Sequence, residues 1–257
     1  MYRQNILRQR LQAGRKVFGC WIELLDPAVT EMLSMVGYDF LLVDTEHGPG
    51  DAMTVAHQLR AASASDTTVI VRVPCNDPVV MKKTLDVGAE AVMIPMVETG
   101  EEAKAAVAAC RYPPRGVRGV AHTDIRGSDY GLKGMDYLRT ASDNIFVICQ
   151  VESATAVGNV EAIAATEGVD MVLIGPFDLS ASLGRPAEFD DPEHKRLMAR
   201  TEKVVKDAGK FLGTTPYGGH TPGELFARGY DLIVGKPDVS MLRDAALQQV
   251  REHRPAG

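Results

Sequence analysis

The stretch Phe40-Leu-Leu-Val-Asp44-Thr-Glu-His47-Gly48 carries the pattern that decides the fold. An uninterrupted apolar run is followed at once by a cluster of polar and ionisable residues. Such a run is typical of a parallel strand buried on both faces, because a half-exposed strand would alternate apolar and polar residues. The polar cluster would then lie at the carboxyl end of that strand.

Other segments of the chain repeat this pattern of a short apolar run with a polar end. Together with Phe40–Asp44 they make eight candidate strands. The others are Val17–Leu24, Thr68–Val73, Ala91–Pro95, Phe146–Val151, Met171–Gly175, Phe211–Thr215 and Asp231–Gly235.

Helical patterns separate the candidate strands, at Pro27–Val36, Ala52–Ala64, Pro78–Val87, Glu101–Cys110, Thr155–Ala165, His194–Ala208 and Pro222–Arg228. An extra helix is predicted before the first strand, at Ile6–Ala13, and a final one at about Val239–Glu252. Strands that alternate with helices imply right-handed crossovers, in a closed barrel or an open doubly wound sheet. The count of eight, and the lack of a Gly-x-Gly-x-x-Gly motif after the first strand, favour a single (β/α)₈ TIM barrel domain over residues 1–257.

The segment Arg111–Asn144 interrupts this alternation. It is rich in Gly, Arg and Asp, and it inserts about 30 residues before the fifth strand. Insertions of this length in a compact domain are usually functional. We therefore expect a lid or a contact loop here.

The composition narrows the possible functions. The formal net charge of −6 and the lack of a Lys/Arg-rich run argue against a nucleic-acid binder. No apolar run approaches the roughly 20 residues of a membrane helix, and Met1–Arg10 has no apolar signal core. None of the four cysteines forms a Cys-x-x-Cys pair, so we expect reduced thiols in a cytoplasmic protein.

Active sites of (β/α)₈ barrels form at the carboxyl ends of the strands. In this chain the polar and ionisable residues concentrate at those ends, while the strand interiors are apolar. They are Glu23, Asp44, Glu46, His47, Arg72, Glu98, Gln150, Glu152, Asp178, Thr215 and Lys236. The sequence therefore predicts that functional side chains converge on one mouth of the barrel.

Glu152 and Asp178 lie at the ends of neighbouring strands and would repel each other unless a positive charge lay between them. Oxygen ligands of this kind suit a hard cation such as Mg²⁺ or Mn²⁺, with waters and substrate oxygens completing the shell, and Co²⁺ or Zn²⁺ could also bind in vitro. The alternative is structural: one carboxylate caps a helix and the other pairs with Arg72 or a lysine.

Asp44 and His47 could form a carboxylate–imidazole pair that acts as a general acid or base, or a helix cap and a solvent-facing histidine. Arg72 ends an apolar strand and needs an anion, either a substrate oxygen or a buried carboxylate. Gly175-Pro176 begins a short helix whose N–H groups could bind a substrate carboxylate. Surface positions are expected for His57, His194, His220 and His253.

The motifs at these strand ends, taken together, resemble those of the HpcH/HpaI aldolase family, the class II pyruvate aldolases. The resemblance covers most of the chain. Its motifs are Phe40-Leu-Leu-Val-Asp44-Thr-Glu-His47-Gly-Pro, Val71-Arg72-Val-Pro74, Leu85-Asp86-Val-Gly88-Ala, Ile94-Pro-Met-Val-Glu98, Arg111-Tyr-Pro-Pro114 with Arg118-Gly119, Gln150-Val-Glu152-Ser and Ile174-Gly-Pro-Phe-Asp178-Leu-Ser-Ala-Ser-Leu-Gly184.

The resemblance implies a function and a role for each site residue. It implies aldol cleavage or condensation of 4-hydroxy-2-oxo acids, with pyruvate or a similar 2-oxo acid such as hydroxypyruvate, and an aldehyde, as substrates and products. The implied metal ligands are Glu152 and Asp178, and the implied catalytic or substrate-binding residues are His47 oriented by Asp44, Arg72, Gln150 and Asp86.

The resemblance also implies an assembly. Members of the family are typically hexamers, built as trimers of dimers. Their C-terminal helix is exchanged between subunits, which would give Val239–Glu252 a role. The family counterpart of Asp86 approaches the active site of a neighbouring subunit.

Three other functions remain open at this point. Lys236 could form a Schiff base with a 2-oxo acid, as in lysine aldolases. A citryl- or malyl-coenzyme A type lyase could share the carboxylate pair, and a noncatalytic barrel could serve as a scaffold. The chain differs from the family pattern at Ala121–Gly131, Thr214–Gly219 and Gly235–Pro237, where preference for the aldehyde would be set.

Overall fold

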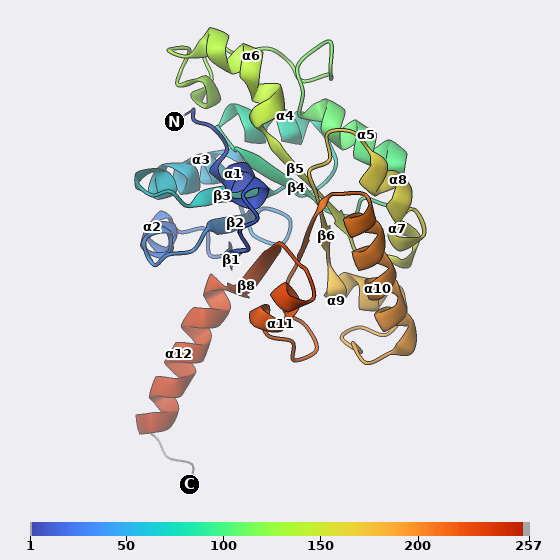
Figure 1. The fold of residues 1–257 in the computed structure, drawn as a ribbon. Helices are drawn as coiled ribbons and strands as arrows, with labels where there is room; N and C mark the ends of the chain where they lie inside the picture. Colours follow the sequence, from blue (N-terminus) through green and yellow to red (C-terminus); the bar gives the residue numbers. More distant parts are fainter. Residues whose placement is uncertain (1, 254–257) are drawn as a thin grey trace.

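Eight parallel strands form a closed barrel in sequence order (Figure 1), and β8 pairs with β1 to complete it. The computed structural model describes residues 2–253. The strands are β1 (Val17–Ile22), β2 (Phe40–Asp44), β3 (Thr68–Arg72), β4 (Ala91–Ile94), β5 (Phe146–Val151), β6 (Met171–Ile174), β7 (Phe211–Thr214) and β8 (Leu232–Pro237). The predicted (β/α)₈ barrel is confirmed, with strand ends displaced by only one or two residues.

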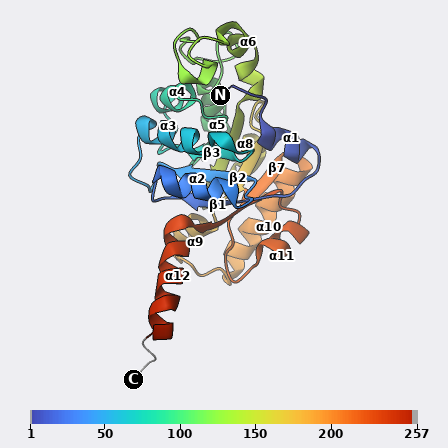
Figure 2. The same cartoon turned by 90° about the vertical axis from the view of Figure 1, so that its left-hand side faces the viewer.

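Most of the helices surround the barrel as an outer ring (Figures 1 and 2). The helices of the structure are α1 (Ile6–Gln12), α2 (Pro27–Met35), α3 (Ala52–Ala61), α4 (Pro78–Asp86), α5 (Gly100–Ala109), α6 (Gly134–Asn144), α7 (Ala154–Gly158), α8 (Val160–Ala165), α9 (Pro176–Ser182), α10 (Pro192–Asp207), α11 (Pro222–Ala227) and α12 (Asp238–His253), with short 3₁₀ turns at Ala62–Ala64 and Arg126–Ser128. Two details differ from the prediction. Thr155–Ala165 is split into two helices, and α6 was not expected.

The strands lie between two hydrophobic cores, and each strand side chain points into one or the other. One core fills the barrel interior and includes Phe40, Leu42, Ile70, Phe146 and Ile148. The other lies between strands and helices. Because side chains alternate along a strand, residues two positions beyond an interior residue also face inward.

This alternation explains why polar side chains reach the barrel mouth. Asp44 and Arg72 follow interior residues of β2 and β3 by two positions, and Gln150 and Glu152 continue the interior row of β5. On β8, Leu232 and Val234 face the interior, and a register shift against β1 interrupts the alternation before Lys236. The amino end of the barrel is instead closed by α1, whose Leu7 and Leu11 are buried in the interior core.

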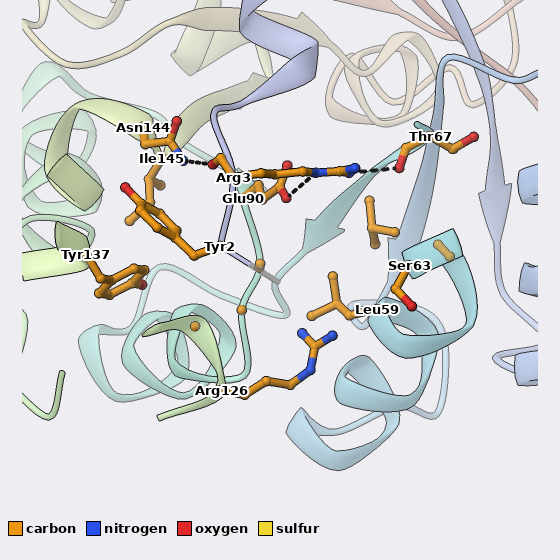
Figure 3. Close-up of a pocket in the computed structure, with 15 residues that line it drawn as sticks. Tyr2, Arg3, Leu59, Ser63, Thr67, Glu90, Arg126, Tyr137, Asn144 and Ile145 are labelled. Atoms are coloured by element: carbon orange, nitrogen blue, oxygen red, sulfur yellow. Dashed lines mark hydrogen bonds and ion pairs between the residues drawn. The ribbon is translucent and has the colours of Figure 1, made fainter. Parts of the chain in front are cut away.

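The insertion packs at the amino end of the strands rather than over the mouth. A small cavity of about 60 Å³ lies there, and Figure 3 shows the residues that line it. Arg3 Nε donates to Glu90 Oε1 at 2.8 Å, and Asn144 Nδ2 donates to the Arg3 carbonyl at 2.8 Å. Arg126 donates to the Val87 carbonyl just after α4, at 2.8 Å. The part from Arg126 to Asn144 is therefore no lid over its own barrel, and a role as a contact loop stays a prediction.

Helix α12 extends away from the barrel (Figures 1 and 2), and Asp238 is its buried residue. Its exchange between subunits stays a prediction. Within residues 2–253, no helix is both long and apolar enough to cross a membrane.

Candidate active site

A cavity of about 500 Å³ opens at the carboxyl ends of the strands. Most of the residues predicted for the active site line it, and these are His47, Arg72, Gln150, Gly175, Pro176 and Asp178. The cavity is also lined by Trp21, Glu23, Thr215 and Lys236. The barrel thus brings residues that are far apart in the sequence to one cavity, as their positions at the strand ends predicted.

Glu152 lies beneath this cavity and is only 2% exposed. Its Oε1 accepts a hydrogen bond from the Met96 backbone N–H at 2.8 Å, and its Oε2 accepts one from Gln150 Nε2. Burial, together with the nearby Asp178 carboxylate, raises the pKa of the Glu152 carboxyl to about 7. The Met96 N–H and Arg72 act in the opposite direction.

Gly175 lets β6 approach Glu152 closely. A Cβ atom at this position would lie 2.5 Å from Glu152 Oε2 and 3.0 Å from Gln150 Nε2. Gly175 follows β6 and is the N-cap of α9. It therefore lies next to the Glu152 carboxylate and begins the turn that carries Asp178. The backbone angle does not require a glycine here, since a φ of −92° is open to any residue. The close approach of the Glu152 carboxylate is what excludes a larger residue.

We predict that Gly175→Ala displaces the Glu152 carboxylate and lowers kcat/KM about 100-fold, since small misplacements in an active site are costly. Gly158→Ala is the matched control, because a Cβ there meets nothing within 4 Å. Steady-state kinetics with circular dichroism melting would separate an active-site effect from unfolding. Full activity of folded Gly175→Ala would show that the spacing between Gly175 and Glu152 is not required.

Arg72 is held by two carboxylates and an aromatic ring. Its Nε and Nη2 donate to Asp44 at 2.8 and 2.6 Å, and its Nη1 lies 3.0 Å from Glu46 Oε2. The guanidinium carbon also lies 4.5 Å from the centre of the Trp21 ring. Such a bidentate, stacked arrangement fixes the guanidinium in one orientation.

The predicted Asp44–His47 side-chain pair is wrong. Both Asp44 oxygens bond to Arg72, and Asp44 Oδ1 also accepts the backbone N–H groups of Glu46, at 3.0 Å, and His47, at 3.4 Å. Asp44 therefore shapes the loop after β2 rather than orienting the imidazole. His47 itself is exposed at the mouth and lines the cavity.

Asp86 lies outside this cavity, at the end of α4. It accepts a hydrogen bond from Arg118 Nη2 at 2.7 Å, and the same nitrogen donates to the Tyr137 hydroxyl at 2.9 Å. The Arg118 guanidinium is further packed against the Tyr112 ring. Within this chain Asp86 anchors the insertion, so a contribution to another subunit's site stays a prediction.

Several contacts near the site were not predicted, although Glu46 itself was expected at the barrel mouth. Trp21 and Glu46 hold Arg72, and Met96 has a left-handed backbone, with φ of 50°, that aims its N–H at Glu152. His194 was expected at the surface but is fully buried, where its Nε2 lies 3.1 Å from the Pro176 carbonyl. The alternation along β1 could have identified Trp21, but the sequence carries no signal for the other contacts.

The donor set around the cavity fits a divalent cation. The carboxylates Glu23, Asp44, Glu46, Glu152 and Asp178 outnumber the cations Arg72 and Lys236. Gln150 Oε1 is buried without a hydrogen-bond partner among the described residues. Within residues 2–253, no group of three or more His, Cys, Asp or Glu side chains could hold a metal. A cation between Glu152 and Asp178 would therefore need waters and substrate oxygens as its other ligands, which Mg²⁺ and Mn²⁺ accept readily.

A closed parallel barrel with acidic, amide and guanidinium side chains at its carboxyl mouth defines the class of (β/α)₈-barrel enzymes. The chain belongs to the HpcH/HpaI aldolase/citrate lyase family, whose model matches residues 17–218. The family assigned by resemblance is confirmed.

Named relatives agree with this assignment. The chain is similar to the 5-keto-4-deoxy-D-glucarate aldolase of Klebsiella pneumoniae, with 42% identity over 88% of this chain and 86% of that protein. It is 39% identical to the hydroxypyruvate/pyruvate aldolase of Chromohalobacter salexigens, over 94% of each chain. A crystal structure of an HpcH/HpaI aldolase/citrate lyase family protein from Burkholderia cenocepacia superimposes with a TM-score of 0.91 at 41% identity, covering 97% of this chain and 99% of that one. The chain is therefore a lyase of the aldolase type.

Proposed function

We propose that this chain is a divalent-metal-dependent aldolase, which cleaves 4-hydroxy-2-oxo acids to a 2-oxo acid and an aldehyde and also catalyses the reverse condensation. The observation that carries the proposal is that Arg72, Asp178 and the Gln150–Glu152 pair meet at one cavity. Glu152 and Asp178 would hold a Mg²⁺, Mn²⁺ or Co²⁺ ion. When bound, the ion would supply Lewis-acid polarisation of the 2-oxo group.

Arg72 is suited to stabilise the negative charge of an enolate. Its hydrogen bonds to Asp44 use two of the five guanidinium N–H groups, and Nη1 is ion-paired with Glu46, so N–H groups on Nη1 and Nη2 remain for a substrate oxygen. The side chain is fixed before substrate arrives, which makes electrostatic stabilisation more effective. This role does not depend on the Asp44–His47 pair.

The other residues bind the substrate or carry protons. The turn at Gly175 and Pro176 lines the cavity at the start of α9, where a substrate carboxylate can meet the backbone N–H groups of the next residues, Phe177 and Asp178. The free Gln150 Oε1 can accept a hydrogen bond from a water or a substrate hydroxyl. His47, exposed at the mouth, is the candidate general base that takes the proton of the aldol hydroxyl.

The relatives' names suggest the donor. One is named for 5-keto-4-deoxy-D-glucarate and another for hydroxypyruvate and pyruvate, so we propose pyruvate or hydroxypyruvate as the 2-oxo acid. The Schiff-base alternative is disfavoured, because the Lys236 side chain is 71% exposed and ion-paired with Asp244, whereas a nucleophilic lysine needs a desolvated setting. A scaffold role would leave the buried carboxylate beneath the cavity unexplained.

A retro-aldol assay tests the proposal. A panel of 4-hydroxy-2-oxo acids is incubated with protein that has been treated with a chelator, with and without added Mg²⁺, Mn²⁺ or Co²⁺, and the released 2-oxo acid is measured with a coupled dehydrogenase. We expect turnover of at least one panel member only when a metal is added. Borohydride trapping of a pyruvate adduct on Lys236, with turnover that survives chelation, would support the lysine mechanism instead.

We also propose a homo-oligomer, as a hexamer built from a trimer of dimers. The support is the apolar surface of α12, where Val239, Leu242, Leu247 and Val250 are all exposed in the single chain. Light scattering would measure the number of chains in the assembly. All four cysteines are free, which supports a cytoplasmic location.

A further inference from the structure

The mouth cavity has two sides with different residues. The groups assigned to the 2-oxo acid come from β3, β5 and the start of α9. The other side, formed by the ends of β7, β8 and β1, is lined by Thr215, Pro216, Lys236, Pro237 and Glu23. The aldehyde part of the substrate must extend from the 2-oxo acid, so this second side is available to contact it.

Lys236 reaches this side because of its position on β8. It lies between Gly235 and Pro237, which also line the cavity, at a register shift in the pairing of β8 with β1 that interrupts the regular alternation of the strand. The burial of β8 ends at Gly235, and Lys236 emerges where the strand reaches the mouth. Its long, flexible stem can then place the ammonium group at varied positions over the cavity.

The charge of Lys236 is free to change partners. Its ion pair with Asp244 is 3.2 Å long, between side chains that are 71% and 42% exposed, and a pair of that kind contributes little. Asp244 also accepts hydrogen bonds from Arg243 at 2.8 and 3.0 Å, so it remains paired when Lys236 moves. Arg72, by contrast, is committed to Asp44 and Glu46.

Without Lys236 this side of the cavity would repel an anion. Glu23 lines it, and Asp178 also lines the cavity. A carboxylate or phosphate on the aldehyde would meet these charges without a partner. Two of the described residues that line the cavity are basic, Arg72 and Lys236. Arg72 is bound to the buried carboxylate of Asp44, whereas Lys236 is not bound to a buried carboxylate.

We propose that Lys236 is a specificity-determining residue that selects acceptor aldehydes bearing an anionic group, a carboxylate or a phosphate. This inference rests on the proposed aldolase function and deepens it. The Lys236 ammonium binds the anion at the β8 side while the aldehyde carbon faces the 2-oxo acid. Glu23 is then placed to accept hydrogen bonds from hydroxyl groups of the same aldehyde.

The test measures kcat/KM for condensation of pyruvate with matched pairs of aldehydes. One pair is 4-oxobutanoate and 4-oxobutanamide, which differ in a carboxylate, and the other is glyceraldehyde 3-phosphate and glyceraldehyde. The variants are Lys236→Met, Lys236→Arg and Lys236→Glu. Lys104→Met is the control, because Lys104 is an exposed lysine on α5 that pairs with Glu101.

We expect the wild type to prefer the anionic member of at least one pair, and that pair identifies the anion. The ratio of kcat/KM for anionic over neutral aldehyde should fall about tenfold in Lys236→Met, mainly through KM, because a charge-assisted hydrogen bond is lost. It should fall further in Lys236→Glu and be largely kept in Lys236→Arg. Lys104→Met should leave it unchanged.

Two results would overturn the inference while leaving the aldolase function intact. One is turnover of neutral aldehydes with no preference for either anion, and the other is an unchanged ratio in Lys236→Met. Loss of all turnover in Lys236→Arg would instead assign Lys236 a nucleophilic role. If no aldehyde reacts with any added metal in the wild type, the proposed function and this inference fail together.

Discussion

The Glu152→Gln variant is expected to lose kcat/KM by at least about 1000-fold, because metal polarisation of the substrate contributes several kcal/mol to catalysis. Glutamine keeps the size of the side chain and can still accept the Met96 N–H bond, which is 2.8 Å long in the wild type. It removes the charge that a cation would share with Asp178. Retro-aldol kinetics at saturating Mn²⁺ would measure the loss.

The same substitution should stabilise the metal-free protein at alkaline pH. Because the folded-state pKa of Glu152 is raised from 4.5 to about 7, the folded chain binds this proton more tightly than the unfolded chain. The stability of the metal-free wild type therefore falls as pH rises from about 4.5 through about 7. Glutamine removes this decline, so we expect a gain on the order of 1–3 kcal/mol at pH 8.

Urea unfolding in the presence of a chelator, from pH 5 to 8.5, would measure the difference. Glu98→Gln is a suitable control, since Glu98 is another glutamate that follows a strand but does not line the cavity. A Glu152→Gln variant that is inactive and also less stable at pH 8 would indicate a structural role for the carboxylate. Wild-type activity in the variant would remove Glu152 from the proposed metal site.

Arg72→Met should lower the free energy of unfolding by about 3–5 kcal/mol, because it leaves the Asp44 carboxylate buried without its cation. Asp44 is fully buried and bonded to Arg72 by both oxygens. Adding Asp44→Asn to Arg72→Met removes the unpaired charge and should recover part of this loss. Activity should stay low in both variants, because the enolate loses its guanidinium.

Denaturant unfolding of the two single variants and the double variant measures the coupling. Arg139→Met is the control, since Arg139 and Asp136 form an exposed pair on α6 whose loss should cost little. A double variant as unstable as Arg72→Met would show that packing against Trp21, rather than charge pairing, accounts for the stability. Arg72→Lys should also lose activity, because lysine lacks the planar fork of donors.

Much of the fold could be predicted because one physical signal is strong. Strands buried on both faces are continuously apolar, so Phe40–Asp44 and its seven equivalents stand out from the polar segments around them. Helix α6 was missed because its start has no such signal: Lys133 is its N-cap and provides no side-chain hydrogen bond, and Gly134 is its first residue. The extent of its burial depends on contacts with the amino-terminal segment, which are distant in sequence.

The position of the active site could be predicted, but not which of its side chains bond to each other. Strand ends and alternation were enough to bring Arg72, Gln150 and Asp178 to one mouth. The partner of Asp44 depended on the register between β2 and β3, which places Asp44 directly opposite Arg72. Sequence spacing left a pair with His47, three residues away, as one of two alternatives, and the family resemblance implied that pair. His194 was misplaced for a similar reason, because its polar helix gives no indication that one face packs against α9.

Binding of Mn²⁺, followed by electron paramagnetic resonance, tests the central claim most directly. The account predicts one bound Mn²⁺ per chain in the wild type, a change in its spectrum when pyruvate is added, and loss of binding in both Glu152→Gln and Asp178→Asn. Undiminished binding in both variants, or full retro-aldol turnover by protein freed of metal, would contradict it.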